Sequence, residues 1–336
     1  MQIPACCFQQ SVVVVPALLF TAFGLSPIVF WIYVSAVLVL IVGLVKIIGE
    51  LPQENGVNKI MPFGRLFFAI PLAVFGSEHF TVTPNVASLV PRWIPAHTFW
   101  VYLTGAAFIC AALSIVTLVK ARLAAALVGM TMLIFVLVMD MPGVIAQPGN
   151  RFFWALALRQ LAFSGGALAF AMSPPVSSRS RPQVRAQSTA LLTIPRLFIG
   201  VPSIFYGVEH FLHPEFVPSI PLQKLTPEWI PGRLPLSYFV GAVLILAGVC
   251  LVLNTKTRLA AIALGLTVLL TMLWVYLPML IAAPTDVVAL NFFFDTLLFS
   301  GAILLLANAI DKEPLPPIHR STSSVGPRAS SLALVC

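Results

Sequence analysis

Long apolar runs, separated by short polar segments, follow one another along the chain. Nine of them come near the roughly 20 residues that an α-helix needs to cross a bilayer. They cover residues 28–48, 64–80, 98–119, 122–140, 152–171, 195–211, 235–254, 258–277 and 287–309. The alternation of apolar and polar positions that a transmembrane barrel needs is absent from them. The pattern predicts an all-α, polytopic transmembrane helical protein. A shorter run, 11–24, contains a proline, so we expect nine or ten crossings.

The second half of this pattern repeats the first. RLFFAIPLAVFGSEHF at 65–80 and RLFIGVPSIFYGVEHF at 196–211 agree at 8 of 16 positions. PRWIP and PEWIP, ARLAA and TRLAA, and two copies of FSG then follow in the same order. Chance similarity between apolar segments does not place polar residues in register. The sequence therefore predicts a tandem repeat of two four-helix bundles after an N-terminal span. Because four crossings return the chain to its starting side, the repeats should be parallel.

These matches divide the chain into five parts. They are an N-terminal segment with one or two transmembrane helices (1–61), a first four-helix repeat (62–172), a linker (173–194), a second four-helix repeat (195–310) and a tail (311–336). The linker and the tail are rich in Pro, Ser and Arg, a composition typical of flexible or disordered segments.

Composition supports the membrane interpretation, and the charges add an orientation. The chain is 59% hydrophobic and 9% charged, so a water-soluble fold could not cover its apolar side chains. The net charge of +8 does not indicate nucleic acid, because Lys and Arg lie at the ends of the runs. Fourteen of the 19 fall on one side of the predicted spans, which should be cytoplasmic. We expect a bacterial inner membrane protein with its linker and C-terminus in the cytoplasm.

Two acid–imidazole pairs end equivalent spans on the opposite side. Glu78 and His79 form the first pair, and Glu209 and His210 form the second. In a partly dry setting such groups could relay protons, bind a quinone headgroup or hold an ion. The alternative is that they cap their helices at the membrane boundary, where ionisable residues cost less than at its centre.

Two further pairs of equivalent residues are candidates. Trp93 and Trp229 lie between prolines in the loops that follow, where they could anchor the headgroup level or line a vestibule for a small amphipathic ligand. Arg159 and Asp295 lie well inside the fourth span of each copy and carry opposite charges. They could form an ion pair between the repeats, or each could reach the interface or another partner.

The sequence predicts no metal site. Its five cysteines include no CxxC pair and no Cys/His spacing typical of zinc or an iron–sulfur cluster. A haem between two helices needs histidines within the spans, whereas the remaining histidines fall in loops or the tail.

The combination of RLF, G-x-EHF, P-x-WIP and RLAA in one four-span unit resembles the DoxX-like (DoxX/DoxD) family of membrane proteins, as two fused copies over about residues 62–310. Members include DoxD, the membrane subunit of an archaeal thiosulfate:quinone oxidoreductase. The resemblance implies an auxiliary or quinone-facing subunit of a membrane redox system, with quinone as the ligand. Without a redox centre it would need a redox partner protein and would not be an enzyme on its own. Competing functions are a small-solute transporter, for which parallel repeats are common, and a membrane scaffold without chemistry.

Overall fold

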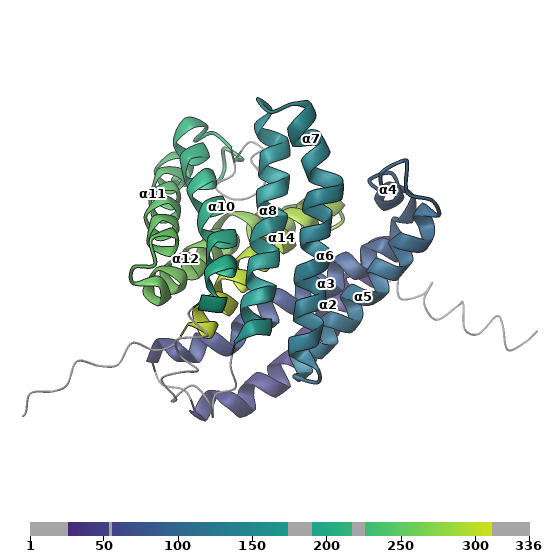
Figure 1. Cartoon of the computed structure of the whole chain (residues 1–336), viewed down its shortest axis with the longest axis horizontal. Helices are drawn as coiled ribbons and strands as arrows, with labels where there is room; N and C mark the ends of the chain where they lie inside the picture. Colours follow the sequence, from purple (N-terminus) through teal and green to yellow (C-terminus); the bar gives the residue numbers. More distant parts are fainter. Residues whose placement is uncertain (1–25, 54–55, 174–189, 217–225, 311–336) are drawn as a thin grey trace, which may run out of the picture.

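The computed structural model describes residues 26–53, 56–173, 190–216 and 226–310 (Figure 1). Its elements are all helices. The first half contains α2 (Pro27–Glu50), η1 (Leu51–Gln53), η2 (Gly56–Ile60), α3 (Met61–Thr81), α4 (Thr83–Ala87), α5 (His97–Thr117), α6 (Ala121–Phe135), η3 (Val136–Asp140), α7 (Met141–Ala146) and α8 (Arg151–Met172). The second half contains α10 (Thr193–Leu212), α11 (Arg233–Val252), α12 (Thr257–Thr271), η5 (Met272–Tyr276), α13 (Leu277–Ala282) and α14 (Val287–Ala309).

Within the described residues, eight helical segments are long and apolar enough to cross a membrane. They are Ile28–Glu50, Asn58–Thr81, His97–Thr117, Ala121–Ala146, Arg151–Met172, Arg233–Val252, Thr257–Ala282 and Val287–Ala309. The predicted polytopic helical fold is confirmed. The run 11–24, most of the linker and the tail lie outside the described residues.

The ninth predicted span, α10, is not among these eight segments. That α10 also crosses the membrane follows from the contact between α8 and α14. Arg159 meets Asp295, and Gly166 meets Ala302 two turns further on, so these two helices run parallel and in register. Between their starts the chain passes along α8, α10, α11 and the α12–α13 segment. An even number of crossings is needed to return to the same side, so α10 has to cross as well.

The two halves interlock. Helix α3 packs against α5 of its own half and against α14 of the other half, whereas α10 packs against α11 and α8. Figure 1 shows α8 upright between α10 and α6. If the four spans of each half are counted from α3 and from α10, with α2 left out, the first helix of each half therefore contacts the fourth helix of the other half. The core between α3, α8, α10 and α14 belongs to both halves.

The third span of each half contains one wide turn. The π-helical turns η3 and η5 lie at Val136–Asp140 and Met272–Tyr276, and Pro142 and Pro278 follow them. Because proline has no backbone N–H, it cannot donate to the carbonyl one turn earlier, and a wider turn accommodates the missing bond. As a result the helix continues to Ala146 and Ala282, beyond the ends expected at 140 and 277.

Candidate functional site

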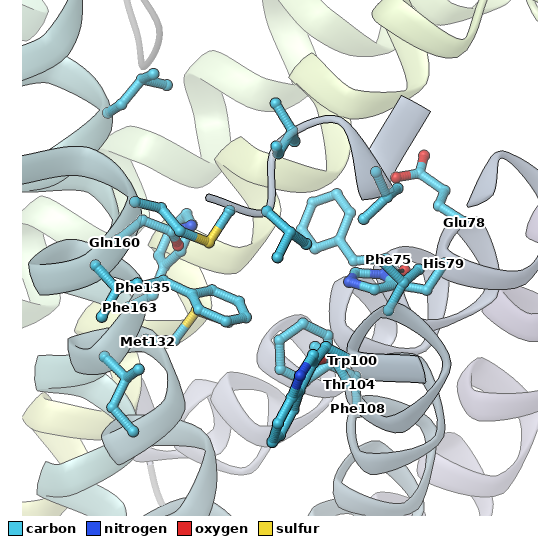
Figure 2. A pocket seen from close by; sticks show the side chains of 18 of the residues that line it. Phe75, Glu78, His79, Trp100, Thr104, Phe108, Met132, Phe135, Gln160 and Phe163 are labelled. Carbon is cyan, nitrogen blue, oxygen red and sulfur yellow. Dashed lines mark hydrogen bonds between the residues drawn. The ribbon is translucent and has the colours of Figure 1, made fainter. Parts of the chain in front are cut away.

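A cavity of about 830 Å³ lies among the helices of the first half and α14 (Figure 2). Phe75 and His79 of α3 face Met132 and Phe135 of α6 across it, and the side chains of α5 form a further wall. Residues between 86 and 95, which connect α3 to α5, also line it, as do Phe152 of α8 and Val288 of α14. The cavity therefore lies on the side where α3 ends and where α8 and α14 begin.

The lining is mostly aromatic and aliphatic, with few polar groups. The aromatic side chains are Phe75, Trp93, Trp100, Phe108, Phe135, Phe152, Phe163 and Phe292. The polar ones are Glu78, His79, Thr104, Arg159, Gln160, Asn291 and Asp295. Trp100 of α5 and Ile134 of α6 are 45% and 51% exposed, so part of the wall lies at the outer surface of the spans.

Glu78 is buried near the end of α3 and faces α14. With its amide nitrogen directed at this carboxyl group, Asn291 donates to Oε1 at 2.6 Å and to Oε2 at 3.3 Å. The partner is neutral. Asp295, one turn further along α14, lies close enough to repel Glu78 when both carry a charge. A second negative charge is therefore costly in this part of the cavity.

His79 projects from α3 into the cavity, as Figure 2 shows. Its Nδ1 lies 2.6 Å from the backbone carbonyl oxygen of Phe75, one helical turn earlier. The ring stands edge-on to Phe108 of α5, with 5.7 Å between centroids. A close approach of α3 and α5 supports this position, because the backbone at Gly105 lies against the Cβ atom of His79.

Arg159 and Asp295 are brought together. Arg159 Nη1 donates to Asp295 Oδ2 at 2.6 Å, and the side chains are 17% and 11% exposed. The pair links α8 to α14 between the two halves, and both residues line the cavity. Asp140 of η3 also lies within the field of Arg159. The structure thus places several of the sequence-derived candidates on one cavity: Glu78, His79, Trp93, Arg159 and Asp295.

The second acid–imidazole pair is placed differently. Glu209 accepts a hydrogen bond from Arg151 Nη1 at 3.1 Å, which links the end of α10 to the start of α8. His210 is 1% exposed, and its Nδ1 lies 2.6 Å from the Tyr206 carbonyl oxygen. Neither residue lines the cavity, nor does Trp229, which is 57% exposed. Of the residues expected to form a vestibule, Glu78, His79 and Trp93 line this cavity together, whereas the loop between His210 and Trp229 lies partly outside the described residues.

Several lining residues were not singled out in the sequence. Asn291 and Gln160 contribute side-chain amides, Thr104 a hydroxyl group and Trp100 an indole next to the loop. Polar residues within apolar spans are the signal that could have found the first three. Among the described residues, no three His, Cys, Asp or Glu side chains come together as a metal site requires.

Comparisons with known proteins matched the two halves separately. Residues 68–161 match a family described as Domain of unknown function (DUF8561), and residues 191–277 match the DoxX family. Neither the comparison with curated proteins nor that with solved structures found a match. The resemblance drawn from the EHF and RLAA motifs is thus confirmed in the second half, whereas the cavity lies mainly in the first.

Proposed function

We propose that the cavity of this membrane protein, whose residues 191–277 match the DoxX family, binds the ring of a lipid-soluble quinone and that the protein is an auxiliary, quinone-facing subunit of a membrane redox system. The observation that carries this proposal is the cavity itself. Its volume of about 830 Å³ falls within the range of small-molecule sites, and its walls combine aromatic faces with a few polar groups.

The lining fits such a ligand in shape and chemistry. Flat aromatic side chains such as Phe108, Phe135 and Phe163 suit a planar ring. The amide of Gln160 and the hydroxyl of Thr104 can donate to ring oxygens. The lipid-exposed part of the wall, at Trp100 and Ile134, would let a ligand dissolved in the bilayer enter from the side.

A bound quinone would supply the two-electron chemistry, while the residues of this chain bind the ring, orient it and exclude water from it. Electrons would come from a redox partner protein. In this proposal the membrane is a bacterial inner membrane, with the linker and the C-terminus on the cytoplasmic side. The cavity lies where α3 ends and α8 begins, on the side of the membrane opposite the linker and the C-terminus. In this orientation it lies near the outer boundary of the bilayer.

A cavity-filling variant tests the proposal. Thr104→Trp places an indole in the cavity, whereas Ala106→Trp places one on the exposed face of the same helix. We expect quinone to co-purify with the wild-type protein and with Ala106→Trp, as measured by native mass spectrometry and solvent extraction. Thr104→Trp should retain less than about a tenth of it, because the added ring occupies the same volume.

The two equivalent glutamates, Glu78 and Glu209, provide an internal control. Glu78→Gln should change quinone retention, because Glu78 lines the cavity, whereas Glu209→Gln should change only thermal stability, because it breaks the contact with Arg151. Equal quinone content in all these variants would overturn the proposal. A protein that contains no quinone but carries solute across proteoliposome membranes would favour the transporter. A protein that shows neither quinone binding nor solute flux would favour the membrane scaffold.

A further inference from the structure

We infer that this cavity selects ligands that donate a hydrogen bond from a ring hydroxyl, such as a hydroquinone or another lipophilic phenol, and that His79 Nε2 is the acceptor. The inference rests on the proposed function, because it concerns the ligand of the same cavity. It adds a chemical preference for the reduced form of the ring over the quinone form.

The tautomer of His79 follows from its neighbour. A backbone carbonyl oxygen can only accept a hydrogen bond, so the Nδ1 atom 2.6 Å from the Phe75 oxygen has to carry a proton. A neutral imidazole has one proton on its two nitrogens, so Nε2 then carries a lone pair. The setting of the ring favours the neutral form, since Phe75 and Phe108 lie around it and a cation would lose most of its hydration.

The cavity presents this lone pair to the ligand. His79 belongs to the cavity wall, and Figure 2 shows its ring directed into the space bounded by Met132 and Phe135. The neighbouring carboxyl group of Glu78 already receives the amide of Asn291. The donors of the cavity belong to other walls, since Thr104 lies on α5, Gln160 lies on α8, and Arg159 of α8 donates through Nη1 to Asp295. At the α3 wall, the ligand therefore meets an acceptor.

The two redox forms of a quinone differ at this point. A quinone oxygen is an acceptor and would face the His79 lone pair without a hydrogen bond between them. A hydroquinone oxygen carries a proton that it can donate to Nε2. In a cavity with mostly apolar walls, this difference amounts to about one hydrogen bond, or roughly tenfold in affinity.

A matched pair of probes tests the preference without redox chemistry. 4-Octylphenol and 4-octylanisole differ by one methyl group on the oxygen, so only the first can donate. We expect the wild-type protein in nanodiscs to bind the phenol about tenfold more tightly than the anisole, as measured by quenching of tryptophan fluorescence. His79→Phe keeps an aromatic ring but lacks the acceptor, and should bind both probes equally.

His97→Phe is the matched control, because His97 starts α5 and does not line the cavity. It should keep the tenfold preference. Equal binding of both probes to the wild type, or a preference that survives in His79→Phe, would overturn the inference and leave the quinone cavity standing. Binding of neither probe would overturn both. The comparison between probes within the wild type holds even where His79→Phe does not fold.

Discussion

At the scale of single residues, the two EHF motifs occupy equivalent places but have different partners. Glu209 has the guanidinium of Arg151 beside it. An offset of 136 residues aligns the fourth spans of the two halves. The residue equivalent to Arg151 is therefore Val287, which has no charge that could pair with Glu78. Glu78 instead meets the neutral amide of Asn291 and lines a cavity. Two differences between the fourth spans, at Arg151 and at Asn291, thus separate a carboxylate that holds two helices together from one that lines a cavity.

The ion pair between Arg159 and Asp295 predicts a charge-swap result. Arg159→Asp alone places two carboxylates opposite each other in a site where both side chains are largely buried. We expect it to lower the free energy of unfolding by about 3–5 kcal/mol, because one partner of a buried pair is left without compensation. Asp295→Arg alone should cost a similar amount. Thermal and denaturant unfolding in detergent would measure both.

The double variant, Arg159→Asp with Asp295→Arg, restores opposite charges across the same contact. It should recover most of the loss. If it is no more stable than the single variants, the pair does not stabilise the contact between α8 and α14.

At the scale of helices, the FSG motif explains how the fourth span of each half packs. Ser164 and Ser300 donate to the carbonyl oxygens of Gly129 and Gly265 in the third span of their own half, at 2.8 and 2.9 Å. The glycine that follows each serine contacts the first helix of the other half. One short motif therefore holds the fourth helix to its own half and lets the other half approach closely.

Gly301 gives a prediction about this approach. A Cβ atom there would lie 2.7 Å from the backbone carbon of Phe67 and 2.9 Å from the Cα atom of Phe68, and backbone cannot move aside as a flexible side chain can. We expect Gly301→Ala to lower the free energy of unfolding by about 1–3 kcal/mol. Gly49→Ala is the control, since nothing lies within 4 Å of its added Cβ, and it should be neutral or slightly stabilising. Equal effects of the two changes on thermal unfolding would contradict the packing argument.

At the scale of the whole molecule, we propose that the chain arose by duplication of a four-span unit. Matched geometry supports this. The two wide turns, the two serine bonds and the bonds of His79 and His210 recur at equivalent positions. Helices α8 and α14 meet through equivalent residues, as the elements on the axis of a two-fold dimer do. That the halves match different families shows how far their sequences differ.

Topology is the prediction that belongs to this scale. In a variant without native cysteines, Ser88→Cys places a thiol on the exposed loop after α4, and Ser177→Cys places one in the linker, outside the described residues. A membrane-impermeant maleimide should label the first in intact cells and the second only after the membrane is opened. Labelling of the linker from outside the cell would contradict the orientation assigned from Lys and Arg.

The sequence by itself determined the order and limits of most helices, because a bilayer imposes a length and a hydropathy on each crossing. It also pointed to Glu78, His79, Arg159 and Asp295, since ionisable residues within apolar spans stand out. Only the tertiary structure decided that the first helix of each half packs on the other half, and that one acid–imidazole pair lines a cavity while the other is packed away. These outcomes depend on residues distant in the chain, such as Asn291 for Glu78 and Arg151 for Glu209, and similar helices with similar motifs do not reveal which of them meet.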